Sequence, residues 1–139
     1  MNTRYSSLVK LKKSTMDKSE RVVQKANADL NSAAMALQIS YSDLKDVEVP
    51  TTGNMSDFLA SRTLLNSQRD LIKHNNQWVD YAKNQVKIAK EQLKSDMIDF
   101  EKFKYLEYQE IKKHLSEVKA KEAKDRKSTR LNPVTWPSR

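Results

Sequence analysis

The sequence has no cysteine, and it has only one glycine and three prolines among 139 residues. The absence of cysteine excludes disulfide bonds, thiol chemistry and metal sites with thiolate ligands. No apolar run approaches the roughly 18 residues of a membrane-spanning helix. The N-terminal stretch also lacks the apolar core of a secretory signal. These absences predict a protein of the cytoplasm.

The few helix-breaking residues are concentrated in one stretch, VPTTGNMSDF, at residues 49–58. It contains the only glycine and the only proline before residue 133. Pro50 disfavours helix at the residue before it, and Gly53 can adopt a positive φ at little cost. Asn54 or Ser56 is predicted to cap a following helix. The sequence therefore predicts one turn between two long helices.

Apolar residues recur every seven positions on both sides of this turn. The series before it is Val9, Met16, Val23, Leu30, Leu37 and Leu44, and the series after it is Phe58, Leu65, Ile72, Val79, Val86, Leu93 and Phe100. A mixed set three residues further on in the first arm includes Lys12, Ser19, Ala26, Ala33 and Ser40. Such a repeat is typical of a coiled coil, whereas a strand would need alternation. The predicted fold is all-α, a long two-helix antiparallel coiled-coil hairpin with unequal arms.

The predicted hairpin is a single domain at residues 1–127. Its parts are a first arm at about 3–48, a turn at 49–56 and a second arm at about 57–127, followed by a disordered tail at 128–139. Thr3 is a candidate cap for the first arm. Folding about Gly53 would place residue 3 opposite about residue 101, so the second arm would project by about 35 Å. Asn75 would then lie across from about Asp29, where a buried amide fixes the register.

The projecting part of the second arm still carries apolar residues. The expected stripe there runs through Met97, Phe100, Lys104, Tyr108, Ile111, Leu115 and Val118. Its two successive spacings of four would relax the supercoil locally. An exposed apolar stripe is predicted to be covered by a partner, and it comprises Tyr105, Tyr108, Ile111, Leu115 and Val118. Self-dimerisation through the same residues, or bending back of the N-terminal residues, is the alternative.

The formal net charge of +8 is unevenly distributed along the chain. Residues 1–25 carry +5, residues 26–100 carry −2 and residues 101–139 carry +5. In a hairpin both basic blocks lie at the open end, which suits docking into an acidic partner. A nucleic-acid binder would use the same lysines for phosphates. The six acidic residues in the last block and the lack of a binding motif argue against it.

The stretch YSSLVKLKKSTMDKSERVVQKANADL at residues 5–30 resembles the N-terminal signature of the FliJ family. That signature has an aromatic residue, a Leu/Val pair, a Lys/Arg cluster and then a charged helix with small residues. The general plan is similar over about residues 3–127. The resemblance implies a component of the flagellar type III export apparatus, similar in shape to the central stalk of rotary ATPases. The stalk proteins of injectisomes are close in shape and stay open as an alternative.

The resemblance also implies two partners. The basic end would enter the ring of the hexameric export ATPase, using Arg4, Lys10, Lys12, Lys13, Lys112, Lys113 and Lys119. The cytoplasmic domain of the export gate would contact the start of the second arm, where alignment on the glycine selects Leu64, Leu65, Gln68, Arg69, Ile72 and Asn76. Some family members escort export chaperones. The protein would then sit at the cytoplasmic face of the inner membrane through the gate alone.

No catalytic, cofactor or metal site is expected. His74 and His114 are far apart, and neither has a second ligand at metal spacing on its own helix face. Catalysis needs groups that converge in a water-shielded site, which a two-helix hairpin does not provide. The runner-up function is a plain coiled-coil scaffold with no ATPase partner. In the tail, Trp136 between two prolines is either a short binding motif or part of a disordered end.

Overall fold

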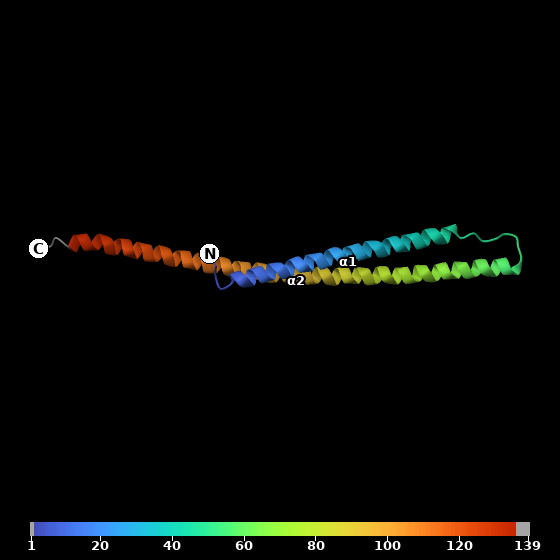
Figure 1. Ribbon diagram of the computed structural model, residues 1–139, viewed down its shortest axis with the longest axis horizontal. Helices are drawn as coiled ribbons and strands as arrows, with labels where there is room; N and C mark the ends of the chain where they lie inside the picture. The colour runs from blue at the N-terminus through green and yellow to red at the C-terminus, as the bar shows by residue number, and fades with distance from the viewer. Residues whose placement is uncertain (1, 136–139) are drawn as a thin grey trace. The chain divides into compact units, whose positions relative to one another are not determined.

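The computed structural model describes residues 2–135, and it describes side chains as far as residue 127. Two helices account for most of this part, α1 (Ser6–Asp46) and α2 (Met55–Thr135), and no strand occurs in it (Figure 1). With 41 residues in α1 and 81 in α2, the arms are unequal. The predicted all-α antiparallel hairpin is confirmed.

The chain divides into two compact units, and each contains a piece of both helices. Unit 1 comprises Met1–Met16 and Asp96–Arg139, and unit 2 comprises Asp17–Ser95.

Both helices begin at polar caps that the sequence predicts. The Thr3 hydroxyl accepts a hydrogen bond from the Tyr5 amide at 3.1 Å, and the Thr3 amide donates to Ser6 Oγ at 2.8 Å. This reciprocal pair is a capping box in which serine takes the usual place of Glu or Gln. At α2, Asn54 Oδ1 accepts from the Asp57 amide at 2.9 Å. Both caps satisfy amides that the first helical turn leaves without partners.

The loop at residues 47–54 contains the one backbone conformation that requires glycine. Gly53 has φ of 148°, and a Cβ there would lie 2.8 Å from Asp57 Oδ2. The predicted role of Gly53 is therefore confirmed. The loop lies beside the first turns of α2, since Val49 and Pro50 line one surface depression with Ala60 and Ser61.

The last residues of α2 extend further than expected. The helix ends at Thr135, whereas the sequence places the end of the second arm near residue 127. Residues 128–132 contain no helix breaker, so the sequence pattern does not require an end at residue 127. Residues 136–139 of the expected disordered tail, including Trp136, lie outside the described residues.

In unit 2 the two helices meet along a seam of small and branched residues. The buried seam residues are Ser19, Ala26, Ala33 and Ser40 on α1, and Ile72, Asn75, Val79, Ala82, Val86 and Ala89 on α2. Ala26 packs with Val86 and Ala89, and Ala33 packs with Val79 and Ala82. The larger Val23, Leu30 and Leu37 are half-buried around these clusters. The alanines let the helix backbones approach closely, and the larger side chains close the sides of the seam.

The register within unit 2 differs from the prediction. Asn75 Nδ2 donates a hydrogen bond to the Ala36 carbonyl at 3.3 Å, so Asn75 lies seven residues further along α1 than Asp29. Residues 47–54 form no helix, and extended chain advances about 3.3 Å per residue against 1.5 Å for a helix. The loop therefore carries the chain past Asp46 before α2 begins (Figure 1). Consequently Phe58, expected in the seam, is exposed.

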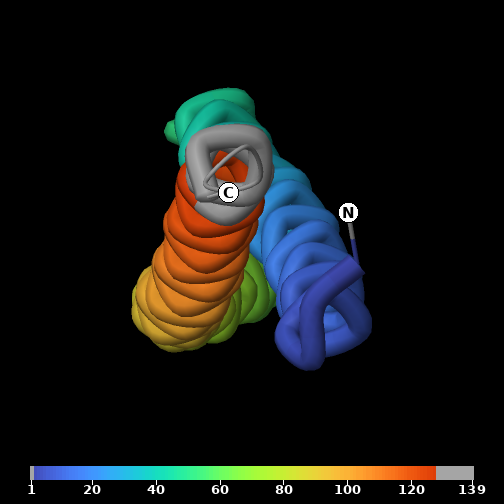
Figure 2. Tube along the Cα trace, turned by 90° about the vertical axis from the view of Figure 1, so that its left-hand side faces the viewer, coloured from blue at the N-terminus to red at the C-terminus, as the bar shows by residue number. Residues whose placement is uncertain are grey.

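Unit 1 shows the same displacement, since Arg4 pairs with Glu110 at 3.7 Å. Residue 3 therefore lies near residue 110, and the prediction of residue 101 is wrong. Figure 2 shows these first turns of α1, in blue, beside the part of α2 drawn in orange. The expected local relaxation at Lys104 is wrong too, because Lys104 is exposed and Phe103 is half-buried. The heptad continues through Phe103 without the second spacing of four.

Candidate functional site

Three of the four basic residues predicted on α1 also bind α2 within unit 1. Lys12 Nζ lies 5.6 Å from the Phe103 ring centroid and 3.8 Å from Asp99 Oδ2. Lys13 Nζ lies 5.8 Å from the Phe100 ring centroid. Arg4, besides its ion pair with Glu110, stacks over its neighbour Tyr5. These side chains hold the two helices together, in addition to any role toward a partner.

The basic residues predicted on α2 are more accessible. Lys112, Lys113 and Lys119 are all exposed, and none has an ion pair within residues 2–127. Lys113 lies one helical turn after Glu110, the partner of Arg4. The shifted register therefore brings the start of the chain next to this lysine group, which the predicted register placed beyond the first arm.

The six gate candidates do not share one face of unit 2. Ile72 is buried, and Leu65 and Gln68 are half-buried. The three exposed members are Leu64, Arg69 and Asn76. Leu64 directly precedes a half-buried residue of the heptad, whereas Arg69 and Asn76 directly follow inward-facing Gln68 and Asn75. The exposed members therefore lie on opposite sides of α2.

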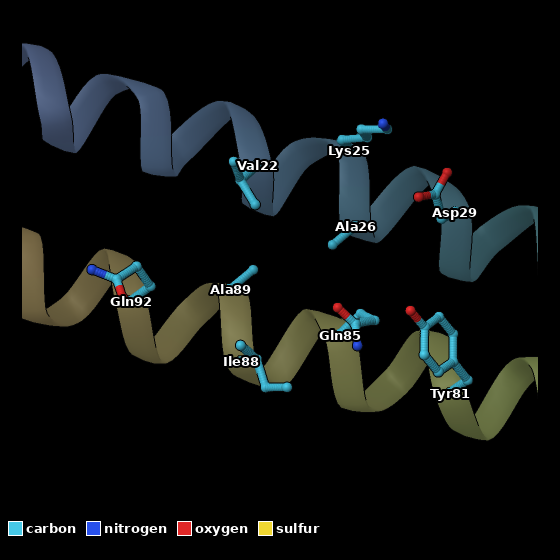
Figure 3. Close-up of a pocket in the computed structure, with 9 residues that line it drawn as sticks. All are labelled: Val22, Lys25, Ala26, Asp29, Tyr81, Gln85, Ile88, Ala89 and Gln92. Carbon is cyan, nitrogen blue, oxygen red and sulfur yellow. The ribbon is translucent and has the colours of Figure 1, made fainter.

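The positions that directly precede the seam residues form one side of unit 2, which we call the groove flank. Along it runs a groove of about 410 Å³ lined by Val22, Lys25, Ala26, Asp29, Tyr81, Gln85, Ile88, Ala89 and Gln92. Figure 3 shows Val22 and Ala26 pointing from α1 toward α2, and Ala89 pointing back. Tyr81 is 63% exposed and Ile88 is 50% exposed. The groove thus has small residues at its floor and large apolar residues at its rim.

Sequence reasoning missed the apolar members of the groove flank on α2. Leu71 and Trp78 are exposed there, seven residues apart, and each directly precedes a buried member of the heptad series. This second apolar series beside the first was visible in the sequence. It would have marked the groove flank as a contact surface next to the gate candidate Leu64.

The residues predicted to form an exposed apolar stripe lie in unit 1. Tyr105, Tyr108, Leu115 and Val118 are exposed, while Ile111 is half-buried. Because the register is shifted, Tyr105 and Tyr108 lie level with the first turns of α1 rather than beyond them. Their side chains nevertheless face away from the contact between the helices.

Comparison with a family model tests the family resemblance of the sequence. The family model described as Flagellar FliJ protein matches residues 1–126. The chain belongs to the FliJ family. Its family makes it a flagellar export component, of a non-catalytic kind. Among curated proteins and solved structures, none gives a significant match to the chain.

The described residues add two observations to the family assignment. Within residues 2–127, no group of three or more His, Asp or Glu side chains is placed to hold a metal ion. Neither α1 nor α2, over their described residues, contains a segment apolar enough to span a membrane. The features of this FliJ family member that a partner can contact are therefore the charged and apolar surfaces of a helical hairpin.

Proposed function

We propose that the chain is the central stalk of the flagellar export apparatus, binding the export ATPase ring and the export gate and promoting substrate export. The observation that carries the ring contact is the accessible lysine group of unit 1. Lys112, Lys113 and Lys119 have no internal carboxylate partner among residues 2–127, so their charges are available to an acidic surface. Lys10 on α1 is exposed as well.

The proposed gate contact uses the start of α2. Its accessible apolar candidate is Leu64, which lies on the groove flank in line with the exposed Leu71 and Trp78. Arg69 and Asn76 are accessible on the opposite side of α2 and belong to a separate surface. Aromatic side chains such as Trp78 are enriched in protein contacts. Through this contact the protein would sit at the cytoplasmic face of the inner membrane. Export chaperones are further candidate partners for the exposed stripe of unit 1.

The test titrates the protein into the export ATPase of the same organism and follows hydrolysis and ring assembly together. We expect stimulation that saturates near one chain per six ATPase subunits. The variant K112E/K113E/K119E should lose most of this stimulation, because reversed charges repel an acidic surface. The variant K25E/K45E/K73E changes the net charge equally in unit 2 and should keep it.

A failure in either arm would count against the proposal. Unchanged stimulation by K112E/K113E/K119E would place the ring contact elsewhere. No effect of the unaltered, helical protein on the ATPase would favour the scaffold function instead. Circular dichroism of each variant separates a lost contact from a lost fold.

A further inference from the structure

The residues that directly follow the seam residues of α2 form a row of lysines in unit 2. The row consists of Lys83, Lys87, Lys90 and Lys94. These lysines follow Ala82, Val86, Ala89 and Leu93, so they lie on the side of the hairpin away from the groove flank. All four line one shallow surface depression, together with Val86 and Glu91. The family assignment and the proposed ring and gate surfaces leave this row without a role.

The row forms no ion pair with the rest of unit 2. None of the four lysines has an ion pair in the part of the chain whose side chains are described, and all four are exposed. The corresponding positions of α1, which follow Val23, Ala26 and Leu30, are Gln24, Asn27 and Asn31. α1 therefore offers uncharged amides beside most of the row. Two exposed carboxylates lie at its ends: Glu20, which follows Ser19 and is level with Leu93, and Asp80, about one turn before Lys83. Glu91 is the one carboxylate in the lining.

The spacing of the row indicates the shape of its partner. The lysines are separated by four, three and four residues, so the row extends about 16 Å along one helix. Acidic residues at the same spacing on another helix form a row of the same length and pitch. Two such helices side by side can pair every ammonium with a carboxylate, as charged flanks do in coiled coils.

The surroundings of the row disfavour two other polyanions. The lining has no aromatic side chain, whereas single-stranded nucleic acids bind through aromatic stacking beside the basic groups. Its only apolar member, Val86, is 7% exposed, so no large side chain is available to enter a lipid surface. We propose that the lysine row is a docking surface for a helix of a partner protein that carries a row of acidic residues at the same spacing.

The probe for this surface is a synthetic helical peptide with four glutamates spaced four, three and four along one face. An isomer of the same composition, with its glutamates around the whole helix, is the control peptide. Binding to the full-length protein is measured by fluorescence anisotropy at low and at physiological salt. The row variant K83Q/K87Q/K90Q/K94Q removes the four charges and keeps a similar helix propensity. The matched control K18Q/R21Q/K25Q/K45Q removes the same charge from α1.

We expect the one-face peptide to bind the unaltered protein and the control variant alike, and to bind the row variant about tenfold more weakly. Affinity should fall as salt screens the contact. Equal binding of both peptides, or equal losses in the two variants, would overturn the proposal. So would tighter row-dependent binding of a DNA duplex, or of vesicles with about 30% phosphatidylserine. Since the ATPase titration uses other residues, failure here leaves the stalk proposal intact.

Discussion

The two units join the same helices by different kinds of contact. In unit 2, alanines and branched residues such as Val79 and Val86 are buried against each other. In unit 1, the contacts between the helices include two ion pairs and lysines over the Phe100 and Phe103 rings, and these phenylalanines are half-buried. Burial of apolar area stabilises with little dependence on salt, whereas exposed charge contacts contribute little and are screened.

This difference concerns the stability of the two units, since both carry proposed binding surfaces. Unit 2 has the closely packed seam that joins the two helices of the hairpin. The groove and the lysine row lie on either side of this seam. Unit 1 has a weaker contact between helices and exposes most of its charge and its tyrosines. We therefore expect unit 2 to determine the stability of the protein and unit 1 to open locally first.

The largest effect is expected from overfilling the seam of unit 2 with Ala33→Leu. Ala33 is 0% exposed and packs against Val79 and Ala82, so a larger side chain must push the helices apart. Overpacking of this kind costs about 1–3 kcal/mol in the free energy of unfolding. Urea unfolding followed by circular dichroism measures it. The neighbouring exposed Ala34→Leu is the control, and equal stability of the two variants would show that the seam is not closely packed.

The heptad repeat explains why the buried seam residues of unit 2 could be predicted. The α2 series from Ile72 to Val86 is buried as expected, and the mixed α1 set through Ala26 and Ala33 forms the centre of the seam. A period of seven selects a helix face whatever the partner, so these residues follow from the sequence alone. The caps at Thr3 and Asn54 follow from local side-chain chemistry in the same way.

The register could not be predicted in the same way. A shift by whole heptads keeps every seam residue in the seam, so the apolar pattern does not distinguish neighbouring registers. The conformation of residues 47–54 decides between them, and neither Pro50 nor Gly53 specifies how far an extended loop travels. The gate candidates were scattered for a related reason. A continuous stretch of sequence on a helix covers every face, and only the positions of the seam residues show which members are accessible.

The second largest loss of stability is expected from Asn75→Ala, which tests the contact that sets this register. Asn75 is 6% exposed and donates to the Ala36 carbonyl, so the variant loses a buried hydrogen bond. The expected loss is about 1 kcal/mol in the free energy of unfolding. Urea unfolding again gives the measurement, with the exposed neighbour Asn76→Ala as the control. Matching midpoints for the two variants would mean that the amide does not help to set the register.

The smallest effect is expected in unit 1, from Lys12→Gln. The variant loses the contact with the Phe103 ring and the ion pair with Asp99, whose side chains are 31% exposed for Lys12 and 46% for Asp99. Solvent screening limits the loss to under about 1 kcal/mol. Hydrogen exchange should therefore become faster at the amides of residues 6–16 and stay unchanged at residues 24–40. Lys10→Gln is the control, because exposed Lys10 has no ion pair within residues 2–127. High salt should produce the same local change in the unaltered protein. If exchange instead quickened equally in both ranges, the two units would open together, and the expectation that unit 1 opens first would be wrong.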